Sequence, residues 1–494
     1  EFHDFQGTHN GGHVLLNGKS TLRVNDKGES TYGISLEITG RDISLDDDLQ
    51  NALRPLPSMH KSWETFRPQG KLFFTASVVR PSADPSELDV RVDAHGPTLA
   101  PTFLAYRLQD VSGQFHFHNN ALQITKVRAR HDQTRLALDR GKIDIHPRGG
   151  YYANLQDIVA DGLVMDDEFL KALPPRLFSA AKAINIRDPL KLRTQVVIYQ
   201  PPETGKPFDV YWDSQIWMQN GRFTTGLEMK DVTGTLACIG RYNGRYLVGV
   251  DGNLVLEKAS LFDQPFSNVH ARFRMHESNP DVMLVNLRAP LVGGDVTGQA
   301  RVNFNSALSY ELNLTASQIN VAEFGRHNFG PQSQFAGLAG ARLYLTGLGT
   351  GGMDTLDGHG AIDIPRGHIY DLPFVLDLLR FLGLSAADRT TFEEFHAAYA
   401  IQGSKVNVKR LDLLGSTISL SGKGDIDLGT KKVELDVYPM WGRVEQLLPT
   451  QVRPVPTTIS KNLLTVEVRG KAGTDARDLK FRMKPMPVLV DPLL

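Results

Sequence analysis

The stretch that decides the fold runs from Ile418 to Pro439 and reads ISLSGKGDIDLGTKKVELDVYP. Its apolar and polar side chains alternate with a period of two, as in a β-strand that buries one face. Gly429-Thr430 interrupts the alternation and is typical of a tight turn. We therefore expect an antiparallel hairpin with its apolar side chains on one face. These apolar positions are Ile418, Leu420, Ile426, Leu428, Val433, Leu435 and Val437.

Three upstream stretches repeat this pattern. They align with it on Gly18, Gly141, Gly298 and Gly424, at uneven intervals that are long for a small solenoid repeat. The matching apolar positions upstream are Leu136, Leu138, Ile143, Ile145, Leu312 and Leu314. The sequence thus predicts a mainly β fold, an elongated and curved antiparallel sheet built of repeated β-meanders.

A short helical segment is expected after each meander. The expected segments are 45–53, 165–174, 320–324 and 441–449. The first two open with Asp46-Asp47-Asp48 and Asp166-Asp167, where the helix dipole favours carboxylates. We expect one continuous body with parts 1–110, 111–265, 266–357 and 358–494.

Residues 371–384 predict a further helix that is apolar on almost every side. Its stripe consists of Phe374, Val375, Leu378, Leu379 and Leu382. At 14 residues it is too short to span a bilayer. One interpretation is a plug at the end of the β core, and the other is contact with lipid or a membrane surface.

The composition is that of a folded protein, with 41% hydrophobic and 22% charged residues among 494. The net charge of −1 has no basic block, which argues against binding to nucleic acid. Cys238 is the only cysteine, so no intrachain disulfide forms. No apolar run is long enough to span a membrane. Because the chain begins at Glu1 and not at Met, we expect any anchor to lie upstream.

Clusters that could carry chemistry have simpler explanations. His116 and His118 point the same way on a strand but lack a third ligand at a diagnostic spacing, so we expect no metal site. The glycines of 347–360 do not open a helix after a strand, which argues against a phosphate loop. Without a catalytic motif, we expect no enzyme activity and no cofactor.

The C-terminal part resembles AsmA-like proteins. Residues 358–384 (GHGAIDIPRGHIYDLPFVLDLLRFLGL) and the meander that opens this section carry the resemblance, which covers about 290–494. It implies a periplasmic protein of the Gram-negative envelope, tethered to the inner membrane, and similar to bridge-like lipid transfer proteins. In these, a taco-shaped β-groove lined by apolar side chains is thought to conduct phospholipid towards the outer membrane.

Two functions remain open at this point. If the apolar sheet face stays open, phospholipid or another lipid is its natural occupant, with envelope membrane proteins as further partners. If the sheet closes on itself, the face is a dry core and the protein is a structural scaffold of an envelope assembly. The oligomeric state, the lipid type and the direction of transport do not follow from the sequence.

Overall fold

The computed structural model describes most of the chain. The described residues are 1–24, 30–52, 54, 57–81, 89–102, 105–146, 148–203, 205–224, 228–261, 264–276, 279–304, 308–331, 335–349, 352–368, 392–415, 418–441, 465–471 and 479–484. They fall into two compact units. Unit 1 comprises 1–223, 230–255 and 273–280, and unit 2 comprises 224–229, 256–272 and 281–494.

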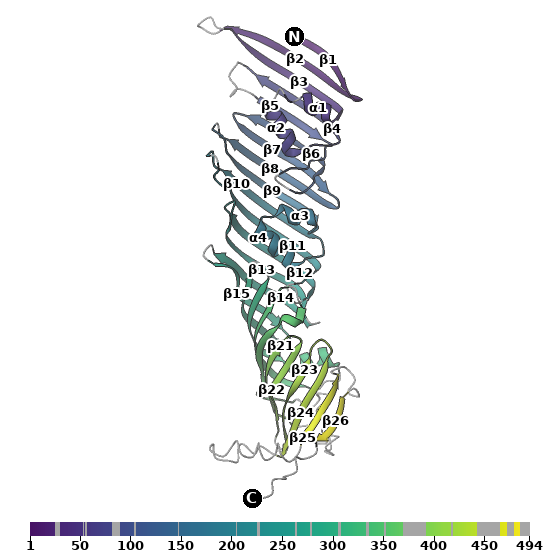
Figure 1. Cartoon of the computed structure of the whole chain (residues 1–494), viewed down its shortest axis with the longest axis vertical. Coiled ribbons are helices and arrows are strands. Elements are labelled where there is room, and N and C mark those ends of the chain that lie inside the picture. Colours follow the sequence, from purple (N-terminus) through teal and green to yellow (C-terminus); the bar gives the residue numbers. More distant parts are fainter. Residues whose placement is uncertain are drawn as a thin grey trace. The chain divides into compact units, whose positions relative to one another are not determined.

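In unit 1, the strands follow one another as antiparallel neighbours in chain order (Figure 1). They are β1 (Phe2–His9), β2 (Gly12–Val24), β3 (Ser30–Ser44), β4 (Lys71–Arg80), β5 (Asp89–His95), β6 (Gln109–His118), β7 (Ala121–His131), β8 (Thr134–Ile145), β9 (Tyr151–Leu163), β10 (Leu190–Gln200) and β11 (Asp209–Thr224). The strands β12 (Glu228–Tyr242), β13 (Leu247–Leu261) and β14 (Gln264–His276) contribute residues to both units.

Unit 2 has the same kind of ladder, from β15 to β19 and on through β21 to β26. Its strands are β15 (Asn279–Leu291), β16 (Gly294–Asn303), β17 (Ser309–Asn320), β18 (Ala336–Leu348), β19 (Asp357–Ile364), β21 (Glu394–Gln402), β22 (Lys405–Leu414), β23 (Ile418–Asp427), β24 (Lys432–Trp441), β25 (Thr465–Lys471) and β26 (Leu479–Lys484). The two-residue strand β20 (Gly367–His368) pairs with β18.

The helices of the described residues are short. They are α1 (Asp47–Ala52), α2 (Pro57–Phe66), α3 (Asp167–Ala172), α4 (Pro175–Ile184), α5 (Val321–Phe329) and the 3₁₀ turn Gly352–Thr355. Asp46, Asp166 and Asn320 accept the backbone N–H of the residue three positions on, at 3.0, 2.7 and 3.2 Å, and so cap α1, α3 and α5. The helix expected over 441–449 lies outside the described residues, except that Trp441 ends β24.

The repeat predicted from the four glycines is present in the strand pairing. Each glycine stands opposite a leucine of the next strand, in the pairs Gly18–Leu36, Gly141–Leu155, Gly298–Leu314 and Gly424–Leu435. The predicted fold class is confirmed: the protein is mainly β, with one open antiparallel sheet of meanders and a few short helices.

Candidate functional site

Apolar side chains of unit 1 line up across its strands on one side of the sheet, which we call the inner face of unit 1. One cross-strand row consists of Leu16, Ile38, Ala76, Val92, Phe115, Ile124, Gly141, Leu155, Val196 and Trp212. The neighbouring row consists of Leu36, Val78, Val90, Phe117, Leu122, Ile143, Ala153, Ile198 and Val210. Both rows cross the sheet without a single charged side chain.

The other side of the same strands, the outer face of unit 1, carries ion pairs. Arg128 contacts Asp139 at 2.7 Å, and Arg193 contacts Asp157 at 2.5 Å. The hydrogen bond from Arg193 lowers the pKa of the Asp157 carboxyl. The sheet of unit 1 is therefore two-sided, with one face suited to water and one to an apolar occupant.

The sequence-predicted residues of β8 belong to the inner face, although their numbering changes parity between Leu138 and Ile143. A Cβ on Gly141 would lie 3.0 Å from Leu155 Cδ2 and 3.6 Å from Leu138 Cδ2, so these side chains share one side. Asp139 and its neighbour Arg140 both reach ion partners on the outer face. The two consecutive outer-face residues shift the alternation of β8 by one position. Leu136 and Leu138 therefore lie on the same side as Ile143 and Ile145.

Most of the inner face of unit 1 remains partly exposed. In the two rows, only Ala153 is buried, and Ile145 at the strand end is 45% exposed. Cover comes at the strand end away from Ile145. There, Phe169 of α3 joins Leu136 and Leu192 in packing against a buried cluster that includes Leu190. An exposed apolar strip of this kind is typical of a binding surface.

The corresponding face of unit 2 is buried. Ile418, Leu420, Val433, Leu435 and Val437 are at most 8% exposed and form one cluster with side chains of other strands. Val466 and Val468 of β25 belong to it and have no exposed surface. We call this the inner face of unit 2, and it is a buried apolar core.

Other predicted positions of unit 2 lie at the margins of this core. Ile426 packs against the cluster, and Leu312 packs with Tyr310 and Leu345 in a second one. Leu314 faces Gly298 on the neighbouring strand and stays partly exposed. Leu428 lies in the turn after β23 and is 40% exposed. The predicted apolar helix, with Phe374, Val375, Leu378, Leu379 and Leu382, lies outside the described residues.

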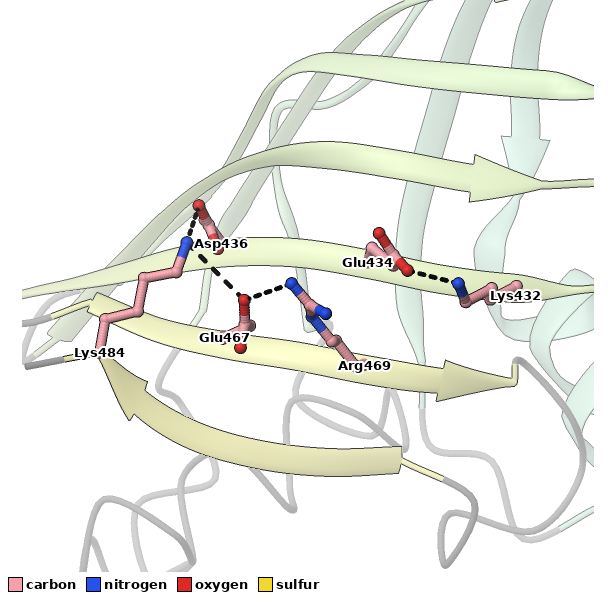
Figure 2. A network of polar contacts seen from close by, with 6 residues as sticks. All are labelled: Lys432, Glu434, Asp436, Glu467, Arg469 and Lys484. Carbon is pink, nitrogen blue, oxygen red and sulfur yellow. Dashed lines mark hydrogen bonds and ion pairs between the residues drawn. The ribbon is translucent and has the colours of Figure 1, made fainter.

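The outer face of unit 2 carries a network of charges. Lys484 Nζ lies 2.6 Å from Asp436 Oδ2. Figure 2 shows this pair together with the pairs Glu467–Arg469 and Glu434–Lys432. Glu434 and Asp436 flank the buried Leu435 in β24. Successive side chains of this strand therefore alternate between the charged outer face and the apolar core.

The histidine pair singled out in the sequence lies on the outer face of unit 1. His116 Nε2 is 2.8 Å from Asp89 Oδ2, and His118 Nδ1 is 3.4 Å from it. Among the described residues, no group of three or more histidine, cysteine, aspartate or glutamate side chains is arranged to hold a metal ion. Burial raises the pKa of the Cys238 thiol, which does not favour the nucleophilic thiolate.

Sequence reasoning missed the N-terminal share of the inner face. Phe115, Phe117 and Trp212 are among its largest side chains, and they were not singled out as site residues. The alternation of the stretch FHFH was the signal that could have found the two phenylalanines, because each lies between polar neighbours.

Comparison with known proteins assigns no relative: no family model and no curated protein matches the chain. Within the described part of the chain, every helix is too short or too polar to cross a bilayer.

Proposed function

We propose that this protein binds lipid on the inner face of unit 1 and acts without catalysis, as a lipid-binding or lipid-conducting protein of the cell envelope. The observation that carries the proposal is the row from Leu16 to Trp212, which is apolar throughout and partly exposed. Acyl chains fit such a row because they cover apolar surface without leaving a hydrogen-bonding group unpaired.

Phospholipid is the proposed occupant, in line with the resemblance to AsmA-like proteins. A periplasmic location, attachment to the inner membrane and movement of lipid towards the outer membrane belong to the same proposal. The polar outer face supports it, since Arg128, Asp139 and their neighbours keep that side in water while the inner face holds apolar chains.

The test compares two double variants at adjacent positions. Ile124→Glu/Leu155→Glu places carboxylates on both sides of Gly141 on the inner face. Gln123→Glu/Asn154→Glu places the same charges one residue away on the outer face. After gentle purification, mass spectrometry of the organic extract should find phospholipid with the wild type and the outer-face variant. The inner-face variant should lose most of it while keeping its far-ultraviolet circular dichroism.

The proposal would be wrong if the wild type carried no phospholipid, or if both variants carried the same amount. A structural scaffold is the second candidate, and the buried inner face of unit 2 favours it, with Leu420 and Val437 each 1% exposed. The scaffold function predicts no bound lipid in any of the three proteins.

A further inference from the structure

The turn ends of β8, β10 and β12 lie side by side at one end of the strands of unit 1, on the left of Figure 1. A Cβ on Gly150 would lie 2.5 Å from the Gln200 carbonyl oxygen, and one on Gly244 would lie 2.8 Å from Pro207 Cβ. The rings of Phe208 and Tyr242 are 6.0 Å apart. These contacts join the three turns into one continuous edge.

This edge is rich in exposed aromatic side chains, which we call the tyrosine rim. The rim consists of Tyr151, Tyr152, Tyr199, Phe208, Tyr211 and Tyr246, each between 39% and 56% exposed. Within the described part of the chain, none of the five tyrosine hydroxyls has a hydrogen-bond partner. Exposed aromatic groups with free hydroxyls suit a boundary between an apolar and an aqueous medium.

The aromatic groups of this edge stand on both sides of the sheet. Tyr152 and Tyr199 are cross-strand partners on the outer face, whereas Tyr151 pairs with Ile145 on the inner face. A protein partner docking on a sheet covers one face. A medium that surrounds the edge contacts both, as the headgroup region of a bilayer does.

Among the described residues, two cations of this edge have no counter-ion. Asp209 is paired with Arg241 at 3.2 Å, and Glu203 with Lys206 at 3.2 Å. Arg148 and Arg245, in the turns after β8 and β12, have no acidic partner among the residues that the structure describes. Both arginines are exposed, so their guanidinium groups are open to an anionic group from outside the protein.

We propose that the tyrosine rim contacts the surface of a lipid bilayer, with the aromatic rings at headgroup depth and Arg148 and Arg245 on lipid phosphates. This contact is a second lipid interaction, apart from the acyl-chain site of the inner face. It gives the strands a membrane-facing end, which the proposed acyl-chain site does not require.

Vesicle co-sedimentation tests the proposal with the whole chain. The probes are vesicles of phosphatidylcholine alone and of phosphatidylcholine mixed with phosphatidylglycerol. Tyr152→Thr/Tyr199→Thr/Tyr246→Thr should weaken binding to both by about tenfold, because three interfacial rings are lost. The matched control is Phe66→Thr/Val164→Thr, which removes side chains that are 40% and 38% exposed at the helix-bearing end and should bind like the wild type.

Arg148→Gln/Arg245→Gln should lose the preference for anionic vesicles and its sensitivity to salt, while keeping the binding to phosphatidylcholine. Equal binding by the rim variant and the control would overturn the proposal. So would a wild-type dimer in analytical ultracentrifugation that the rim variant abolishes, because the rim would then be a contact between copies. Rim variants should retain co-purifying phospholipid, and Ile124→Glu/Leu155→Glu should retain vesicle binding. Failure of the membrane-contact proposal can therefore be told apart from failure of the proposed function.

Discussion

Leu155 in unit 1 and Leu435 in unit 2 occupy the same place in two repeats, each opposite the glycine on which the repeats align. Leu155 is partly exposed in an apolar row, whereas Leu435 is 5% exposed and packed in a cluster with side chains of other strands. Their local sequences alternate in the same way. The period of a strand therefore establishes which side chains share a face, and the rest of the chain decides whether that face is covered.

The difference in burial between the two leucines predicts different losses in the free energy of unfolding. A buried leucine loses its transfer energy and leaves a cavity when it is truncated, whereas a partly exposed one lets water or an occupant fill the space. A chain that buried both faces equally would gain stability and lose its open surface. The exposed rows of unit 1 are thus a cost to stability that a bound lipid would offset.

The largest expected effect is on the two leucines themselves. Leu435→Ala should lower the free energy of unfolding of its region by about 3 kcal/mol, and Leu155→Ala by about 1 kcal/mol or less. Hydrogen-exchange mass spectrometry in a urea series measures both regions in one chain, from peptides of β24 and β9. Equal losses would mean that the two faces are covered alike, against the comparison.

A smaller effect is expected when the glycines opposite these leucines are replaced. Gly424 has φ +150°, and a Cβ there would lie 2.1 Å from the Glu434 carbonyl oxygen. At Gly141 the nearest atom is the movable Leu155 Cδ2, at 3.0 Å. Gly424→Ala should cost about 2 kcal/mol and Gly141→Ala less than about 0.5 kcal/mol in the same exchange experiment. The reverse order would show that unit 1 is the more tightly packed.

The smallest effect concerns the helix caps and appears only in acid. The backbone N–H of Leu49, with Asn10 and His9, lowers the pKa of Asp46 from 3.8 to about 2. Because the folded-state pKa is the lower one, this carboxylate stabilises α1 fully above pH 3.8, and the contribution disappears as the pH falls towards 2. The cap of α5 is Asn320, which does not titrate.

Protection factors of the α1 and α5 peptides should diverge over this range. Acid should loosen α1 and leave α5 unchanged relative to its surroundings, and Asp46→Asn should remove the pH dependence of α1 because asparagine keeps the cap without titrating. If the protection factors of the wild-type α1 peptide did not change between pH 3.8 and 2, this would contradict the assigned cap.

Much of the architecture could be predicted from particular residues. The alternation around Ile418 and Leu435 predicted the strands, and the four glycines predicted which strands are equivalent. Asp46 and Asp166 were expected at helix starts, and both cap a helix. These features depend on neighbours in sequence, which a pattern records.

The exposure of the predicted face could not be read in the same way. Ile143 and Ile418 look alike in their strands, yet one is partly exposed and the other is 3% exposed. The shift in alternation at Asp139 and Arg140 could not be predicted either, since two consecutive polar residues resemble the end of a strand. Both features depend on contacts with distant strands and helices.

The most direct test of the central claim is site-specific photo-crosslinking in cells, with benzoylphenylalanine at Leu155 on the inner face or at Asn154 on the outer face of β9. An open, lipid-bearing inner face predicts phospholipid adducts at position 155 and none at position 154, one residue away. Adducts at neither position, or at both to the same extent, would contradict it.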